Sequence, residues 1–184
     1  MSRQGFLTES GFSLMDLMMT VAVMSIMFGI SVPIMRDAVD GMRLGMALRD
    51  VEREMQTARL KSVSANRPLR VRFNCPAVGQ IRIVEITGVA ATDSAANRCD
   101  ETAFPYPGPR DTNPATPAHD GPVRRLHFSV SVAGPDLQFF PNGTTQQVVS
   151  GTPQPIASPV SVTITKGSDY SMVTVNALGK IDIQ

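Results

Sequence analysis

Hydrophobic and polar positions divide the chain into three parts, and the first part is almost wholly apolar. From Phe12 to Met35 the only ionisable side chain is that of Asp16. A helix over residues 12–35 would be about 36 Å long, enough to cross a hydrocarbon core of about 30 Å. The apolar region of a secretory signal is shorter, about 7–15 residues, so the length argues against simple removal as such a signal. We therefore expect a membrane-spanning helix.

Residues 36–66 show the spacing of an amphipathic helix. Charged and polar side chains fill the other faces, and a single apolar stripe recurs at Leu44, Leu48, Val51, Met55 and Ala58. This stripe predicts a helix that packs on a globular domain. The helix should end near Asn66, because asparagine suits a helix C-terminus and Pro68 cannot continue a helix.

Pro33 lies near the boundary between these two helical parts. Proline removes a backbone donor and clashes with the carbonyl group four residues earlier, so the sequence predicts a kink or a local opening around Gly29. In a filament such a break lets a helix bend around its neighbours. In a plain membrane anchor proline is tolerated and has no special role.

Residues 67–184 alternate short β-type runs with turn residues, which predicts an antiparallel, mostly β domain. Tight turns are expected at Asn142-Gly143 and Leu178-Gly179, the second closing a hairpin. The whole chain is therefore expected to have an α+β fold, with a long N-terminal helix packed on a C-terminal antiparallel β-sheet domain. The expected strands lie in PLRVRFNC, QIRIVEI, VRRLHFSVSV, LQFFPNGTT, PVSVTIT, SMVTVNA and KIDIQ.

An irregular stretch, residues 87–123, interrupts this pattern. It is rich in proline, alanine, aspartate and threonine and is too long for an ordinary connection, so we expect it to be either functional or mobile. Its acidic side chains offer the oxygen atoms that calcium prefers, but their spacing matches no calcium loop. We therefore interpret them as a solvated loop; they are Asp93, Asp100, Glu101, Asp111 and Asp120.

Composition and motifs exclude several classes of function. The chain has 17 Lys and Arg against 16 Asp and Glu, and it has no Trp, so neither charge nor stacking predicts nucleic-acid binding. No G-x-S-x-G motif is present, and His119 and His127 lack the spacing of metal ligands relative to the two cysteines. We expect no enzymatic activity, no metal and no cofactor.

Asp16 is the position that needs an explanation. A carboxylate costs about 2.5–3.5 kcal/mol at the bilayer centre and less near an interface. If the chain is cut after Gly11, Phe12 gains a free amino group four residues from Asp16. The acid would then pair with that amine or with the amine of a neighbouring copy. The alternative is an interfacial acid at the start of a plain single-pass anchor.

The stretch GFSLMDLMMTVAVMSIMFGISVP resembles the class III signal and N-terminal helix of type IV pilins and type II secretion pseudopilins. Gly11, Phe12, Asp16 and Pro33 fall on the family's conserved pattern in order, although the family acid is usually Glu. The resemblance implies that residues 1–11 are a leader removed by prepilin peptidase, which also methylates the Phe12 amine. It implies a pilin fold, a single pass through the bacterial inner membrane and a periplasmic C-terminal domain. The implied partners are other pilin subunits and an inner-membrane assembly platform.

The C-terminal part resembles the GspH/FimT-type minor pilins and pseudopilins. The resemblance rests on LQFFPNGTT and on VTVNALGKIDIQ, which contains Gly179 between the last two expected strands. It also raises DNA as a partner, because FimT-type minor pilins are known as receptors for natural transformation. The basic clusters available for this role are Arg67, Arg70, Arg72, Arg124 and Arg125, with Lys180 beside Asp182 near the C-terminus.

Cys75 and Cys99 bracket the first part of the irregular stretch. If the domain lies in the periplasm, as the resemblance implies, a disulfide between them would persist. Closing about 25 residues would contribute roughly 3 kcal/mol in the chain-entropy model. Two reduced, unrelated cysteines are the alternative.

Three hypotheses of function follow. The first is a minor pilin or pseudopilin, a structural subunit processed after Gly11 and assembled through its N-terminal helix into a pilus or pseudopilus. The second is a DNA-binding minor pilin. The third is a single-pass anchored periplasmic protein that never assembles.

Overall fold

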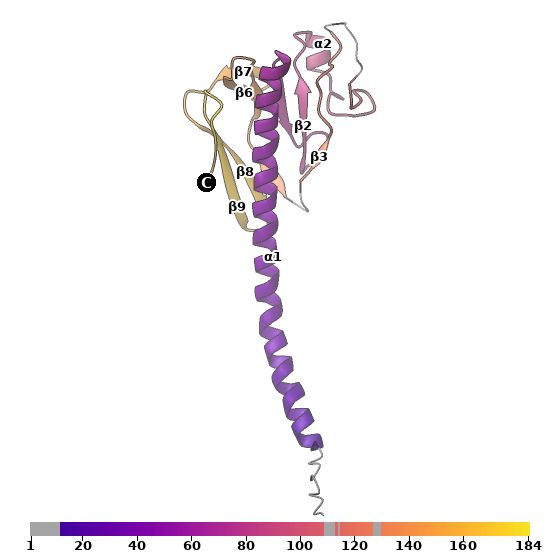
Figure 1. The fold of residues 1–184 in the computed structure, drawn as a ribbon, viewed down its shortest axis with the longest axis vertical. Helices are drawn as coiled ribbons and strands as arrows, with labels where there is room; N and C mark the ends of the chain where they lie inside the picture. The colour runs from indigo at the N-terminus through magenta and orange to yellow at the C-terminus, as the bar shows by residue number, and fades with distance from the viewer. Residues whose placement is uncertain (1–11, 109–112, 114, 127–129) are drawn as a thin grey trace, which may run out of the picture. The chain divides into compact units, whose positions relative to one another are not determined.

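The structure is a computed structural model that describes residues 12–108, 113, 115–126 and 130–184 (Figure 1). The chain divides after Val39 into two units, and each is considered by itself. One helix, α1 (Leu14–Ala65), contributes to both units. Its α-helical conformation has no break at Gly29 or Pro33, so the local opening that the sequence predicted there is not seen.

Helix α1 ends where the sequence predicted. The residue after it, Asn66, has a left-handed backbone with φ of 52°, and the Arg67 N–H donates to the Ser62 carbonyl at 3.1 Å. Asparagine tolerates this conformation better than most residues, which makes it a suitable helix terminus.

The C-terminal unit contains two antiparallel sheets (Figure 1). A short helix, α2 (Ala90–Asp93), lies between β2 and β3 in the chain. The strands of the six-stranded sheet are, in spatial order, β3 (Arg124–Arg125), β2 (Gln80–Glu85), β1 (Leu69–Phe73), β5 (Asp136–Phe139), β6 (Thr145–Val149) and β7 (Thr152–Pro155). Those of the four-stranded sheet are β10 (Ile181–Ile183), β9 (Asp169–Val175), β8 (Val160–Lys166) and β4 (Ser131–Ala133).

One hydrophobic core joins the C-terminal half of α1 to both sheets. The predicted stripe is buried, together with Ala47 and Ser62 on the same side of the helix. Leu69, Val71 and Phe73 reach this core from the six-stranded sheet, as their alternation indicated, and β8 and β9 reach it from the other sheet. Figure 1 shows β2 and β3 to one side of α1 and β8 and β9 to the other. The predicted α+β fold is therefore confirmed.

Two details of the sheets differ from the sequence prediction. The β6–β7 hairpin was not expected, because Pro153 and Pro155 break the strand pattern; β7 is an edge strand, where a missing N–H is tolerated. The run VRRLHFSVSV is not one strand, since its described parts form β3 in one sheet and β4 in the other. His127, in the middle of this run, lies outside the described residues.

The predicted hairpin between β9 and β10 is present and depends on Gly179. Ile181 pairs with Val175, and the Gly179 N–H donates to the Asn176 carbonyl at 3.0 Å. Gly179 has φ of +72°, and a Cβ there would lie 2.7 Å from both the Gly143 carbonyl oxygen and the Arg59 Nε atom. The glycine is required both for the turn and for its packing against the other predicted turn.

Substituting Gly179→Ala should therefore lower the free energy of unfolding by more than the left-handed backbone alone explains. Gly151→Ala is the matched control, because Gly151 has φ of +81° but open space around a Cβ. We expect a loss of about 1 kcal/mol for the control and about 2–4 kcal/mol for Gly179→Ala. Urea denaturation of the full chain in detergent, followed by tyrosine fluorescence, measures both; equal losses would contradict the packing argument.

Candidate functional site

The first candidate is the apolar half of α1. Every residue from Phe12 to Val39 is exposed, and the most apolar 18-residue window has a mean hydropathy of 2.1 with none of it buried within the structure. By length and composition α1 is the one helix of the described chain that could cross a membrane. A continuous apolar surface of this size needs either lipid or another protein to cover it.

The hydroxyl groups within this segment are satisfied by the helix itself. Thr20 Oγ1 donates to the Leu17 carbonyl at 2.9 Å, and the hydroxyls of Ser25 and Ser31 each donate to a carbonyl four residues earlier at 2.8 Å. Such bonds need no water, so these side chains are compatible with a hydrocarbon environment. Asp16 is therefore the polar side chain of this segment that a hydrocarbon environment does not suit.

Asp16 lies in the first turn of α1. The Ser13 carbonyl accepts the N–H groups of Asp16 and Leu17, at 3.0 and 3.2 Å, and the Ser13 hydroxyl accepts the Met15 N–H at 3.3 Å. An acid in a first helical turn gains about 0.3–1 kcal/mol from the helix dipole. This gain is smaller than the cost of about 2.5–3.5 kcal/mol at a bilayer centre. No described residue donates a hydrogen bond to the carboxylate, so the dipole alone does not explain Asp16.

Phe12 precedes the helix, and the residue is 83% exposed. Gly11, the predicted cleavage position, lies outside the described residues. Pro33 lies inside α1, within the exposed apolar surface.

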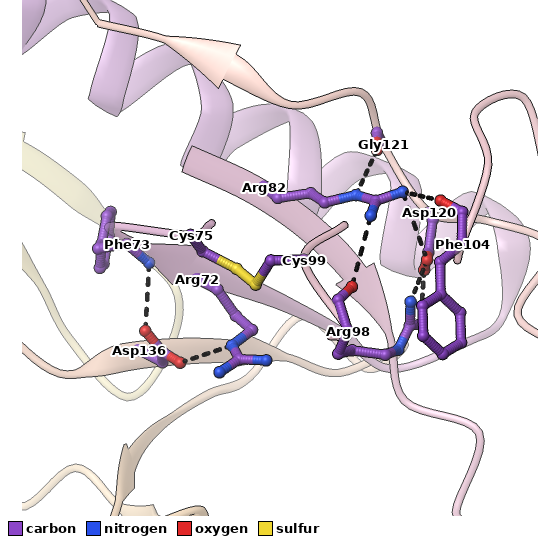
Figure 2. Close-up of a disulfide and its surroundings, with 10 residues drawn as sticks. All are labelled: Arg72, Phe73, Cys75, Arg82, Arg98, Cys99, Phe104, Asp120, Gly121 and Asp136. Atoms are coloured by element: carbon purple, nitrogen blue, oxygen red, sulfur yellow. Dashed lines mark hydrogen bonds and ion pairs between the residues drawn. A yellow bond between two sulfur atoms is a disulfide. The ribbon is translucent and has the colours of Figure 1, made fainter. Parts of the chain in front are cut away.

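The second candidate is the irregular stretch, whose described part is fixed to β2 (Figure 2). A disulfide joins Cys75 and Cys99, whose Cα atoms are 5.4 Å apart. Arg82 of β2 is fully buried on the face of the sheet opposite the core, since Ile81 and Ile83 face the core. Its guanidinium donates to the carbonyls of Gly121 at 3.0 Å and Phe104 at 2.5 Å.

A buried ion pair between Arg98 and Asp120 completes this attachment (Figure 2). Arg98 Nη2 donates to Asp120 Oδ1 at 2.7 Å and to the Glu85 carbonyl at 2.9 Å, while Asp120 accepts the Glu85 N–H at 2.8 Å. The guanidinium also lies 4.5 Å from the centre of the Phe104 ring. The interpretation of Asp120 as part of a solvated loop is therefore wrong, because its side chain is only 1% exposed.

The other described acidic residues of the irregular stretch also stabilise its conformation, because they accept hydrogen bonds within it. Asp93 accepts hydrogen bonds from Thr87 and Gly88, and Glu101 accepts the Val123 N–H. Hydrogen bonds from the Thr102 hydroxyl and N–H hold the pKa of Asp100 below its ordinary value. Among the residues that the structure describes, no group of three or more His, Cys, Asp or Glu side chains could hold a metal ion.

The arginines considered for DNA do not form a common free surface. Arg67 pairs with Glu85 at 3.7 Å, and the buried Arg70 donates to Gln138 Oε1 at 2.9 Å. Arg72 pairs with Asp136 at 3.4 Å (Figure 2). Burial raises the pKa of Asp136, against the lowering effects of the Phe73 N–H and of Arg72.

The remaining cations divide between two places. Lys180 pairs with Asp182 at 2.9 Å, which neutralises the charge next to the C-terminus. Arg124 and Arg125 stay exposed on β3.

Comparison with protein families and with curated proteins found no match. Among solved structures, the type IV minor pilin FimU of Pseudomonas aeruginosa is 16% identical in one crystal form and 14% in another, with TM-scores of 0.43 and 0.46. These alignments cover 77% of this chain and 92% and 87% of FimU. The minor pseudopilin EpsH of Vibrio cholerae is 9% identical, with a TM-score of 0.45 over 77% of this chain and 96% of EpsH. All TM-scores lie below 0.5, so the functional argument rests on this chain's own residues.

Substituting Asp120→Asn should lower the free energy of unfolding by about 3–5 kcal/mol, because it leaves buried arginines without their counter-charge. Asp182→Asn is the matched control, since its pair with Lys180 is largely exposed and should cost less than about 1 kcal/mol. Urea denaturation measures both losses, and limited proteolysis tests whether cleavage between residues 87 and 123 accelerates. Equal stability of the two variants would contradict a structural role for the buried ion pair.

Proposed function

We propose that this protein is a minor pilin or pseudopilin, a structural subunit of a type IV pilus or of a type II secretion pseudopilus. The observation that carries the proposal is the change in environment along α1. Residues 12–39 are exposed, and from Phe12 to Met35 they are apolar except for Asp16 and a few hydroxyl groups; the same helix enters the core of the β domain from Leu44 onward. One half of the helix thus holds the domain while the other half is left for a membrane or for neighbouring helices.

In this proposal the apolar half has two successive environments. It first anchors the subunit in the inner membrane, with the β domain in the periplasm, and then packs against the corresponding helices of other subunits in the filament. Both environments cover the same side chains, so moving from one to the other costs little of the apolar burial. The hydroxyl groups that bond to their own helix remain satisfied in either environment.

Asp16 supplies the specificity of docking. Prepilin peptidase cleaves after Gly11 and methylates the Phe12 amine, and the Asp16 carboxylate of one subunit pairs with the Phe12 amine of a neighbour. This charge pair offsets the free-energy cost of placing the Asp16 carboxylate in an apolar environment, which the helix dipole offsets only in part. A purely hydrophobic contact lacks direction, whereas a single buried charge pair selects one register between helices.

The test of processing is mass spectrometry of the N-terminus after expression in membranes that contain a prepilin peptidase. The expected chain begins at N-methylated Phe12. A Gly11→Val variant in the same membranes is the control and should remain uncut. A wild-type chain that keeps residues 1–11 would overturn the processed-pilin proposal and leave a plain membrane anchor.

The test of docking compares Asp16→Ala with Asp37→Ala, which removes an exposed acid from the same helix outside the motif. We expect Asp16→Ala to insert into the membrane at least as well as wild type, because a charge has been removed. Its incorporation into sheared filaments should nevertheless fall at least about tenfold, which corresponds to about 1.4 kcal/mol. Asp37→Ala should incorporate normally. Undiminished incorporation of Asp16→Ala would show that Asp16 is only an interfacial acid.

A further inference from the structure

The C-terminal unit contains a groove that the proposed function does not use. It has a volume of about 440 Å³ and runs between the polar side of α1 and the segment around β3. Tyr106 and Ile83 contribute to its lining, and its charged members are Asp50, Arg53, Glu54, Lys61, Arg124 and Arg125.

The shape of the groove suits an extended chain. Its helical wall runs from Asp50 to Lys61 along one side of α1. At about 1.5 Å per residue these positions span about 16 Å, the length of about five residues of an extended peptide. The opposite wall contains β3, which pairs with β2 on one side and with no other described strand. An edge strand offers unpaired backbone groups to an extended partner.

The charge of the groove favours an acidic partner. Its lining holds four cations and two carboxylates, a surplus of two positive charges. Glu54 is already matched, since it pairs with Arg124 at 3.4 Å across the groove. Within the described chain, the side chains of Arg53, Lys61 and Arg125 make no hydrogen bond or ion pair.

Partial burial makes the charges of Lys61 and Glu54 more effective than those on open surface. Burial lowers the pKa of Lys61, and the negative charges of Asp120 and Glu85 only partly oppose it. Burial also raises the pKa of Glu54, although Arg124 opposes the shift. Water is thus partly excluded from both groups. In such a site an added counter-charge gains more than it would in bulk water.

We propose that this groove binds an extended acidic segment of another polypeptide, with carboxylates directed at Lys61 and Arg125 and the backbone beside β3. A nucleic acid fits less well. Its phosphates carry charge at every step, and some of them would meet Asp50 and Glu54. A peptide can instead carry its acidic groups only where the groove is basic. The inference concerns the β domain and does not depend on processing of the N-terminal helix.

The test uses the full chain in a non-ionic detergent and the labelled peptide Glu-Val-Glu-Val-Glu, whose length matches the groove. Fluorescence anisotropy should show binding of this peptide and not of Lys-Val-Lys-Val-Lys. Lys61→Gln should weaken binding about five- to tenfold, as expected for loss of a partly desolvated ion pair. Arg125→Gln should weaken it about two- to fivefold, because Arg125 is exposed. Arg49→Gln is the control, because Arg49 is exposed on α1 and does not line the groove.

Three results would overturn the proposal. The first is no binding of the acidic peptide at 1 mM, about the affinity of a −4.1 kcal/mol interaction. The second is equal weakening by Arg49→Gln in variants whose urea midpoints match wild type. The third is binding of a single-stranded thymidine oligonucleotide that Lys61→Gln and Arg125→Gln abolish while the peptide does not bind, which would assign the groove to nucleic acid. Correct processing at Phe12 together with any of these results would leave the pilin proposal intact.

Discussion

The contact between the C-terminal half of α1 and the two sheets is the interaction on which the rest of the domain depends. Both sheets turn apolar side chains toward the same stripe of the helix, and Ala47 and Ala58 are fully buried in it. Small side chains let the backbones approach closely, so strands from two sheets reach one helix. Without α1 each sheet would expose an apolar face. The C-terminal half of the helix is therefore part of the core of the domain.

The six-stranded sheet is covered on its second face in a different way. There arginine, carboxylate and backbone carbonyl groups attach the irregular stretch, around Arg82, Arg98 and Asp120. Ordering so many residues costs conformational entropy. The disulfide offsets part of that cost, because it restricts the same residues in the unfolded chain. Hydrogen bonds to most polar atoms of Arg82, Arg98 and Asp120 keep the arrangement specific, although the buried Arg98 Nε has no partner within the described chain.

The apolar half of α1 and the groove beside β3 are surfaces of opposite chemistry. The first is broad and, from Phe12 to Met35, carries charge only at Asp16, whereas the second is narrow and carries charge at several positions. Hydrophobic burial provides affinity and charge provides register and partner choice. A subunit that uses both would hold to a filament through its helix and contact a further chain through its β domain.

The sequence alone determined the features that depend on local pattern. These are the apolar segment, the buried stripe, the end of α1 at Asn66 and the turn at Gly179, because each is set by residues within a few positions of one another. Only the tertiary structure decided that Arg98 meets Asp120 and that Lys61 lines the same groove as Arg125. These pairs come from segments far apart in the chain, and whether a charge is buried and paired or solvated depends on which segments the fold brings together.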